Sequence, residues 1–102
     1  MMTIEMTPAE VRRILHVGYM VTTGHPNPSG ASKWASAELG VWPSTLTRWM
    51  TGRVAMTQRS KYSLRLLWRV VMLQSGSDAV HEAQTRYDEW LASPEAADWI
   101  PR

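Results

Sequence analysis

Residues 43–51 of this chain carry small hydroxyl side chains and one arginine at a spacing that places them on one side of a helix. The apolar residues of the same segment, Leu46, Trp49 and Met50, fall at i, i+3 and i+4 and are expected to face inward. The outward set falls at i, i+3, i+4 and i+7 and consists of Ser44, Thr47, Arg48 and Thr51. Short hydroxyl side chains let a helix backbone approach closely, and a guanidinium matches the O6 and N7 acceptors of guanine. The pattern is therefore typical of a helix that lies in the major groove of DNA.

The polar residues of this region divide into two expected roles. The residues expected to contact base edges are Ser44, Thr45, Thr47, Arg48 and Thr51. The residues expected to contact phosphates, which set the register without reading sequence, are Lys33, Trp42, Arg53, Arg59 and Lys61. Two alternatives stay open here: Arg48 is a solvated helix residue, and Trp42 packs on the core instead of against the sugar-phosphate backbone.

Charge is distributed unevenly along the chain, although the formal net charge is only +2. Residues 11–77 contain a single acid, Glu38, and nine basic residues, which are Arg12, Arg13, Lys33, Arg48, Arg53, Arg59, Lys61, Arg65 and Arg69. The acids that follow this basic block are Asp78, Glu82, Asp88, Glu89, Glu95 and Asp98. Because a polyanion attracts the basic block and repels the acidic segment, we expect the acidic segment to face away from DNA. The alternative is a solvated surface whose charges segregate without function.

The elements that must position these residues are all expected to be helical. Residues 7–10 combine a Thr cap, a first-turn Pro and a Glu three residues after the cap, which predicts a helix that ends before Gly24. Further helices are predicted over residues 31–39, from 43 or 44 to 51, over 60–74 and through 80–91, with a short last turn near 93–99. Gly18, on the apolar stripe of the first helix, indicates close contact with a neighbouring helix. The fold class is therefore all-α, a compact bundle of about five helices.

The helix over residues 60–74 is apolar on two faces. One face carries Tyr62, Leu66, Val70 and Leu73, the other carries Leu64, Leu67 and Val71, and only a basic strip of Lys61, Arg65 and Arg69 separates them. Such a helix needs cover from a later helix, a second subunit, or both. We expect a homodimer, with an interface formed by Leu64, Leu67, Trp68, Val71, Tyr87, Trp90 and Leu91.

Composition excludes several classes of protein. The chain has 102 residues, which suits one domain over 1–102, and it has no cysteine, which excludes disulfides, thiol chemistry and the usual zinc fingers. The absence of a long apolar run and of a signal-peptide pattern predicts a cytoplasmic protein without membrane contact. The histidines His16, His25 and His81 have no second ligand or acid at a useful spacing, so we expect no metal, no cofactor and no enzymatic activity.

Residues 32–52 resemble the helix-turn-helix of the lambda repressor and Cro-like (XRE-type) family. The resemblance rests on Leu39, Gly40 and Val41 at the turn, followed by Ser44, Thr45, Leu46, Arg48, Trp49 and Gly52. It implies an all-helical domain whose third helix, about residues 43–51, enters the major groove while the second lies across the groove and touches the backbone. On this resemblance, residues 7–58 form the DNA-binding part and residues 59–102 the helices of the dimer.

The function expected from these patterns is sequence-specific binding of double-stranded DNA by a transcriptional regulator. The protein resembles the dimeric repressors of phages and other mobile elements, which bind inverted-repeat operators. Two alternatives remain open: an antitoxin-like regulator whose acidic C-terminal half binds a basic partner protein, and a helical protein-interaction module that does not bind DNA.

Overall fold

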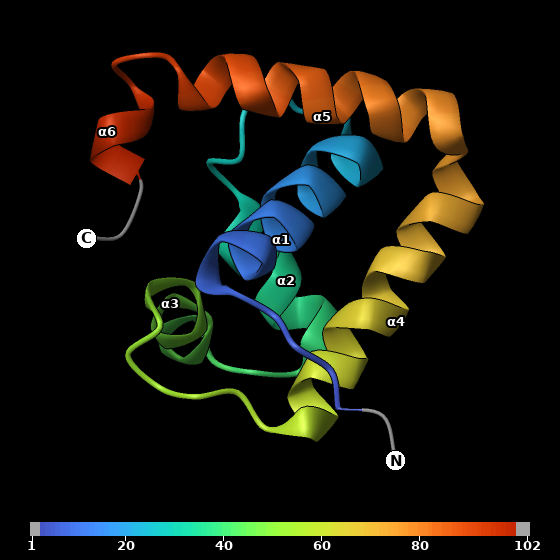
Figure 1. Cartoon of the computed structure of the whole chain (residues 1–102). Helices are drawn as coiled ribbons and strands as arrows, with labels where there is room; N and C mark the ends of the chain where they lie inside the picture. The colour runs from blue at the N-terminus through green and yellow to red at the C-terminus, as the bar shows by residue number, and fades with distance from the viewer. Residues whose placement is uncertain (1–2, 100–102) are drawn as a thin grey trace.

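A computed structural model describes residues 3–99, and all regular secondary structure in that range is helical (Figure 1). The helices are α1 (Pro8–Thr23), α2 (Ala31–Leu39), α3 (Pro43–Thr51), α4 (Gln58–Ser75), α5 (Ser77–Leu91) and the short α6 (Ala96–Trp99). The expected all-α class and the order of its helices are confirmed. None of the helices in this range combines the length and the apolar character needed to cross a bilayer.

Local capping residues determine where the helices begin. At α1, the Thr7 Oγ1 accepts a hydrogen bond from the Glu10 backbone N–H at 3.2 Å, and Glu10 reaches back to the Thr7 N–H, which confirms the predicted capping box. At α4, the Thr57 Oγ1 accepts from the Ser60 N–H at 3.1 Å. This cap explains why α4 begins at Gln58, two residues before the predicted start.

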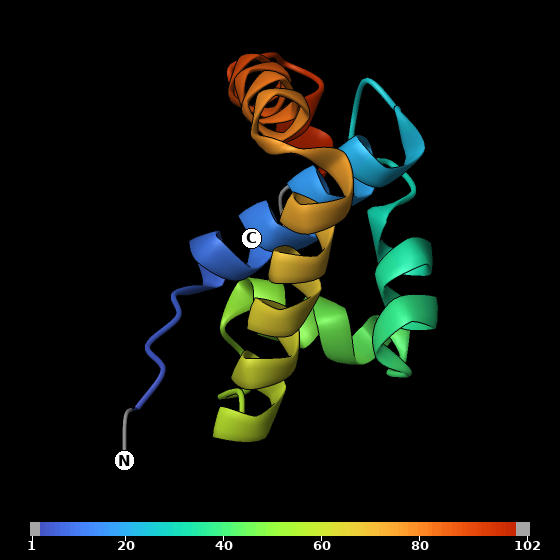
Figure 2. The same ribbon diagram turned by 90° about the vertical axis from the view of Figure 1, so that its right-hand side faces the viewer.

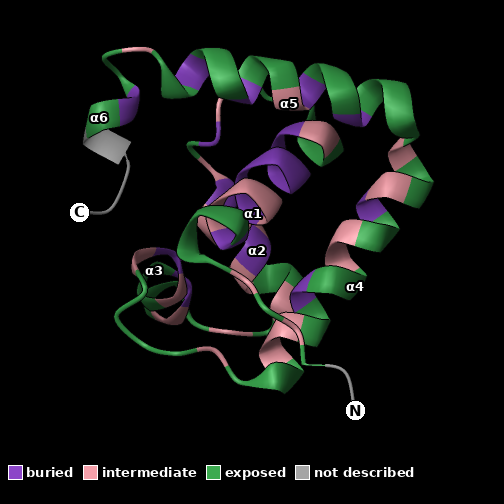
Figure 3. Ribbon diagram, in the orientation of Figure 1, coloured by how far each residue is buried: buried purple, intermediate pink, exposed green. Residues whose placement is uncertain are grey.

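Helix α1 lies at the centre of the bundle and packs against α2, α3, α4 and α5. Figures 1 and 2 show α5 across one end of α1, and α4 running down from α5 along the side of the bundle. The first half of α1 contributes Val11 and Leu15 to a cluster with α2, α3 and α4. Its second half contributes Val17 and Met20 to a cluster with α5 and α6, and residues 15–20 of α1 are continuously buried (Figure 3).

Close helix contacts occur at two glycines. A Cβ on Gly18 would lie 3.2 Å from the Trp34 ring of α2, which confirms the expected close approach. A Cβ on Gly30 would overlap the Tyr19 hydroxyl and lie 2.8 Å from its ring carbon Cζ. The absence of a side chain at both positions lets α2 lie close to α1.

A polar contact inside the core joins α1 to α5. His16 is buried, and its Nδ1 lies 2.9 Å from the Tyr87 hydroxyl, within hydrogen-bond distance. Burial, and secondly the nearby charge of Arg12, lowers the pKa of His16 from 6.5 to about 4. Beside this pair, Arg13 donates to Asp88 at 2.6 Å and its guanidinium lies 5.6 Å from the Tyr87 ring centre. His16 is therefore a structural residue that is neutral at pH 7.

The structure corrects most of the predicted dimer interface. Four members of that set, Leu64, Val71, Tyr87 and Trp90, are buried in the core of the single chain and cannot meet a second copy. Leu67 and Trp68 are half-buried, and Leu91 is exposed. For these four residues the prediction was wrong, because an apolar pattern on α4 or α5 does not reveal which face the rest of the same chain covers. The dimer itself stays a prediction.

Candidate nucleic-acid interface

The turn between α2 and α3 is held by hydrogen bonds to Ser36. The backbone N–H groups of Gly40 and Val41 both donate to the Ser36 carbonyl, at 3.0 and 3.3 Å, and the Ser36 hydroxyl donates to the Val41 carbonyl. Gly40 takes the left-handed conformation, with φ of 65°, that this sharp turn requires. Only residues 40–42 separate the two helices, so these bonds set the angle between α2 and α3.

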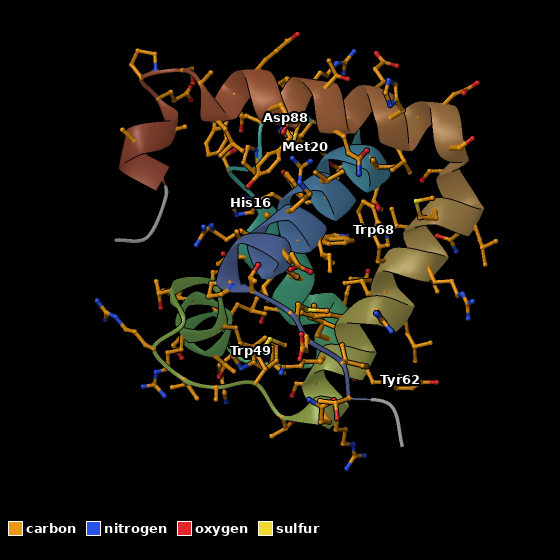
Figure 4. The ribbon with its side chains drawn as sticks, viewed as in Figure 1. His16, Met20, Trp49, Tyr62, Trp68 and Asp88 are labelled. Atoms are coloured by element: carbon orange, nitrogen blue, oxygen red, sulfur yellow. The ribbon has the colours of Figure 1, made fainter. Side chains whose placement is uncertain are left out.

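One face of α3 is anchored in the core. Leu46 and Met50 are buried in the cluster that includes Val11, Leu15, Ala35 and Leu64, and Trp49 packs against the same cluster. Figure 4 shows Trp49 between α3 and the neighbouring part of the bundle. The predicted inward set is thereby confirmed, and α3 is fixed by its apolar side.

Arg12 adds an anchor that sequence reasoning missed. Its Nη1 donates a hydrogen bond of 2.6 Å to the Met50 carbonyl at the end of α3. A cation at this position also interacts favourably with the partial negative charge of a helix C-terminus. Arg12 was counted with the basic block, but its hydrogen bond lies inside the fold. The sequence carries no signal for this contact, because the acceptor is a backbone carbonyl 38 residues away.

The opposite face of α3 is open to solvent. Ser44, Thr47 and Arg48 are exposed, and Thr45 and Thr51 are half-buried. This division follows the predicted inward and outward sets. The structure therefore brings the five predicted base-reading residues together on one helix of nine residues that presents a polar surface.

Two of the hydroxyls on this face are already used as donors. The Thr47 Oγ1 donates to the Pro43 carbonyl at 3.2 Å, and the Thr51 Oγ1 donates to the Thr47 carbonyl at 2.9 Å. These residues can still offer a hydroxyl lone pair or a methyl group. Within the described residues the hydroxyls of Ser44 and Thr45 form no hydrogen bond. Ser44, Arg48 and the half-buried Thr45 are therefore the donors that α3 offers to a ligand.

The residues predicted to contact phosphates come from α2, from the two ends of α3 and from the start of α4. Lys33 on α2, Arg53 after α3 and Arg59 on α4 are exposed, and Lys61 is half-buried. Trp42, the N-cap residue of α3, is 78% exposed, so it does not pack on the core and is available to a ligand. Among the described side chains the ion pairs are Arg13–Asp88 and Arg86–Glu82. No described carboxylate therefore neutralises Arg48 or the predicted phosphate-binding cations.

The acidic helix lies apart from this surface. Helix α5 crosses the end of the bundle, with α1 between it and α3 (Figure 1). Two of its acids, Asp88 and Glu82, are paired with Arg13 and Arg86. The positions of α3 and α5 agree with the expectation that the acidic segment faces away from the polar face of α3.

Comparisons with protein-family models, with curated proteins and with solved structures found no significant match.

Proposed function

We propose that this chain is a sequence-specific DNA-binding regulator of the helix-turn-helix class, with α3 as its reading helix. The carrying observation is the two-sided structure of α3: one side is locked into the core by Leu46 and Met50, and the other exposes Ser44, Thr47 and Arg48. A rigid helix with short polar side chains and one free guanidinium has the chemistry needed to read base edges. A solvated surface helix requires neither the hydrogen-bonded turn at Ser36 nor the hydrogen bond from Arg12 to the Met50 carbonyl.

The dimensions support this role. An α-helix with its side chains is about 10–12 Å in diameter, which suits a major groove about 12 Å wide, and the nine residues of α3 extend roughly 13 Å along it. In this mode Arg48 contacts guanine, and Ser44, Thr45, Thr47 and Thr51 contact neighbouring base edges or thymine methyls. Lys33, Trp42, Arg53, Arg59 and Lys61 contact the backbone on either side and fix the register.

The proposal includes two copies on one operator. A single short helix reads only a few base pairs, and two-fold sites place their halves about 34 Å apart, one turn of DNA. We therefore expect the operator to be an inverted repeat, and regulation to follow from occupation of a promoter. Of the predicted interface residues, Leu91, Leu67 and Trp68 remain accessible at least in part.

Replacement of Arg48 by Ala is expected to raise the Kd for the operator about 10- to 100-fold, because each bidentate contact to guanine contributes about 1–3 kcal/mol of discrimination. Affinity for unrelated DNA should change little. Fluorescence anisotropy with a labelled duplex, at one fixed salt concentration, measures both values.

The matched control for this experiment is Arg86→Ala. Arg86 is an arginine on α5 that is paired with Glu82 and distant from α3, so its loss removes the same formal charge elsewhere. An equal loss of affinity in the two variants would show that the contribution of Arg48 is only a long-range charge effect. That result would contradict the proposal that α3 contacts the bases of the operator.

A further inference from the structure

The outer face of α4 carries an apolar stripe that the chain itself leaves uncovered. Tyr62, Leu66, Val70 and Leu73 are 57%, 42%, 47% and 79% exposed and recur at i, i+4, i+8 and i+11. The stripe extends roughly 16 Å along the helix. Tyr62 points away from the bundle (Figure 4). Single exposed apolar side chains are ordinary, but an aligned set indicates an interaction surface.

The stripe borders a groove between α4 and α1. One hollow of about 410 Å³ lies along α4 and is lined by Tyr62, Leu66, Arg69 and the pair Arg65 and Trp68. A second hollow of about 300 Å³ shares Arg65 and Trp68 and continues to Met6 and Ile14. Trp68 packs against the core cluster of α1 and α5 and reaches from α4 toward α1 (Figure 4). The two hollows meet at Arg65 and Trp68 and are together called the groove; Tyr62 and Leu66 of the stripe line the hollow along α4.

The charges beside the stripe indicate the chemistry of the partner that binds there. Helix α4 carries Arg59, Lys61, Arg65 and Arg69 and has no acidic residue. Neither described ion pair involves these side chains. A second copy laid against the same stripe would bring Arg65 and Arg69 close to their own counterparts, which is unfavourable. DNA would match the charge but would gain nothing from Leu66, Val70 and Leu73.

We propose that the stripe and groove of α4 bind an acidic amphipathic helix of a partner protein. The apolar side chains of that helix, spaced at i, i+3 or i+4 and i+7, cover the stripe. Its Asp or Glu side chains meet Arg65 and Arg69. Glu5 and Glu10 line the α1 end of the groove, so the acidic helix lies along α4 and not across that end.

The stripe is separate from the proposed reading face on α3, although Arg59 and Lys61 of α4 belong to the proposed phosphate contacts. Helices α3 and α4 lie on different sides of α1, and the stripe belongs to the outer face of α4 (Figure 1). A partner helix on α4 therefore leaves the polar face of α3 open. The same chain can then hold a partner protein while it is bound to DNA.

The test uses two synthetic helical peptides and the full chain. Each peptide has about 18 residues, the length of α4; both carry the same leucine spacing, and one has Glu where the other has Lys. Fluorescence anisotropy is expected to show that the Glu peptide binds at least about tenfold more tightly than the Lys peptide. Leu66→Glu should weaken that binding by about tenfold or more, because it places a like charge and a polar group on the stripe.

The control is Val54→Glu, which introduces the same charge at an exposed apolar residue after α3, outside the groove. It should leave the affinity for the Glu peptide unchanged, and circular dichroism should show that both variants keep the wild-type helix content. Failure of the Glu peptide to bind, equal binding of both peptides, or an equal loss in the two variants would overturn the proposal. So would a wild-type dimer in sedimentation that Leu66→Glu converts to a monomer, since a second copy would then cover the stripe.

Discussion

Acidification from about pH 7 to about pH 4 is expected to lower the free energy of unfolding by about 3 kcal/mol through His16 alone. The pKa of His16 is about 4 in the folded chain and returns to 6.5 on unfolding. Between these values the unfolded chain binds a proton that the folded chain does not. The contribution of the neutral buried imidazole is therefore complete above pH 6.5 and is lost as the pH falls toward 4.

Urea unfolding followed by circular dichroism at several pH values measures this effect. His16→Asn should remove most of the decline across this range, whereas His81→Gln, at an exposed histidine on α5, should leave it in place. An NMR titration of the imidazole measures the pKa of His16 directly in the wild-type protein. A His16 signal that titrates near pH 6.5 in the folded protein would contradict the buried, neutral assignment.

Leu46→Ala is expected to lower the free energy of unfolding by about 3–5 kcal/mol, the range for truncation of a fully buried leucine. Leu46 has no exposed surface and fixes the middle of α3 to the cluster of Val11, Leu15 and Leu64. Since the cavity would lie directly beneath α3, we also expect the operator affinity to fall. Chemical denaturation at pH 7 measures the loss of stability.

Leu73→Ala is the matched control, because Leu73 is 79% exposed and its truncation leaves no cavity. Its free energy of unfolding should stay within about 0.5 kcal/mol of the wild type. A Leu46→Ala protein that is as stable as Leu73→Ala would mean that α3 does not rest on the core. The rigid presentation of its polar face would then have no physical basis.

Helix boundaries and the orientation of α3 could be predicted because their causes are local. The capping box at Thr7 and Glu10 and the turn at Gly40 lie within a few residues of the helix ends they determine. The inward and outward faces of α3 follow from the helical period, since one set is apolar and the other is polar.

The missed features depend on contacts between distant segments. The hydrogen bond from Arg12 to the Met50 carbonyl joins a side chain to a backbone group, which leaves no complementary residue to find. The covered face of α4 could not be chosen because Leu64 and Leu66 are the same residue type on opposite sides of one helix. Their difference in burial arises only when α1, α2 and α3 pack against the Leu64 side.

The hydroxyl groups of α3 could be predicted only in part: the face on which they lie follows from the sequence, but their hydrogen bonds do not. Thr47 and Thr51 lie on the predicted polar face, but they donate to carbonyls of their own helix. Back-bonding to the preceding turn is always open to a helical threonine, so periodicity alone does not reveal it. The remaining donors, Ser44, Thr45 and Arg48, therefore carry more of the proposed recognition than the sequence pattern indicated.

Selection of bound duplexes from a random DNA pool, followed by titration of the selected duplex over a range of salt, tests the central claim most directly. The proposal predicts enrichment of an inverted repeat, weaker binding as salt rises, and loss of the sequence preference in Arg48→Ala. If no motif is enriched and no duplex is bound at low salt, the polar face of α3 and the surrounding cations do not form a DNA-binding surface.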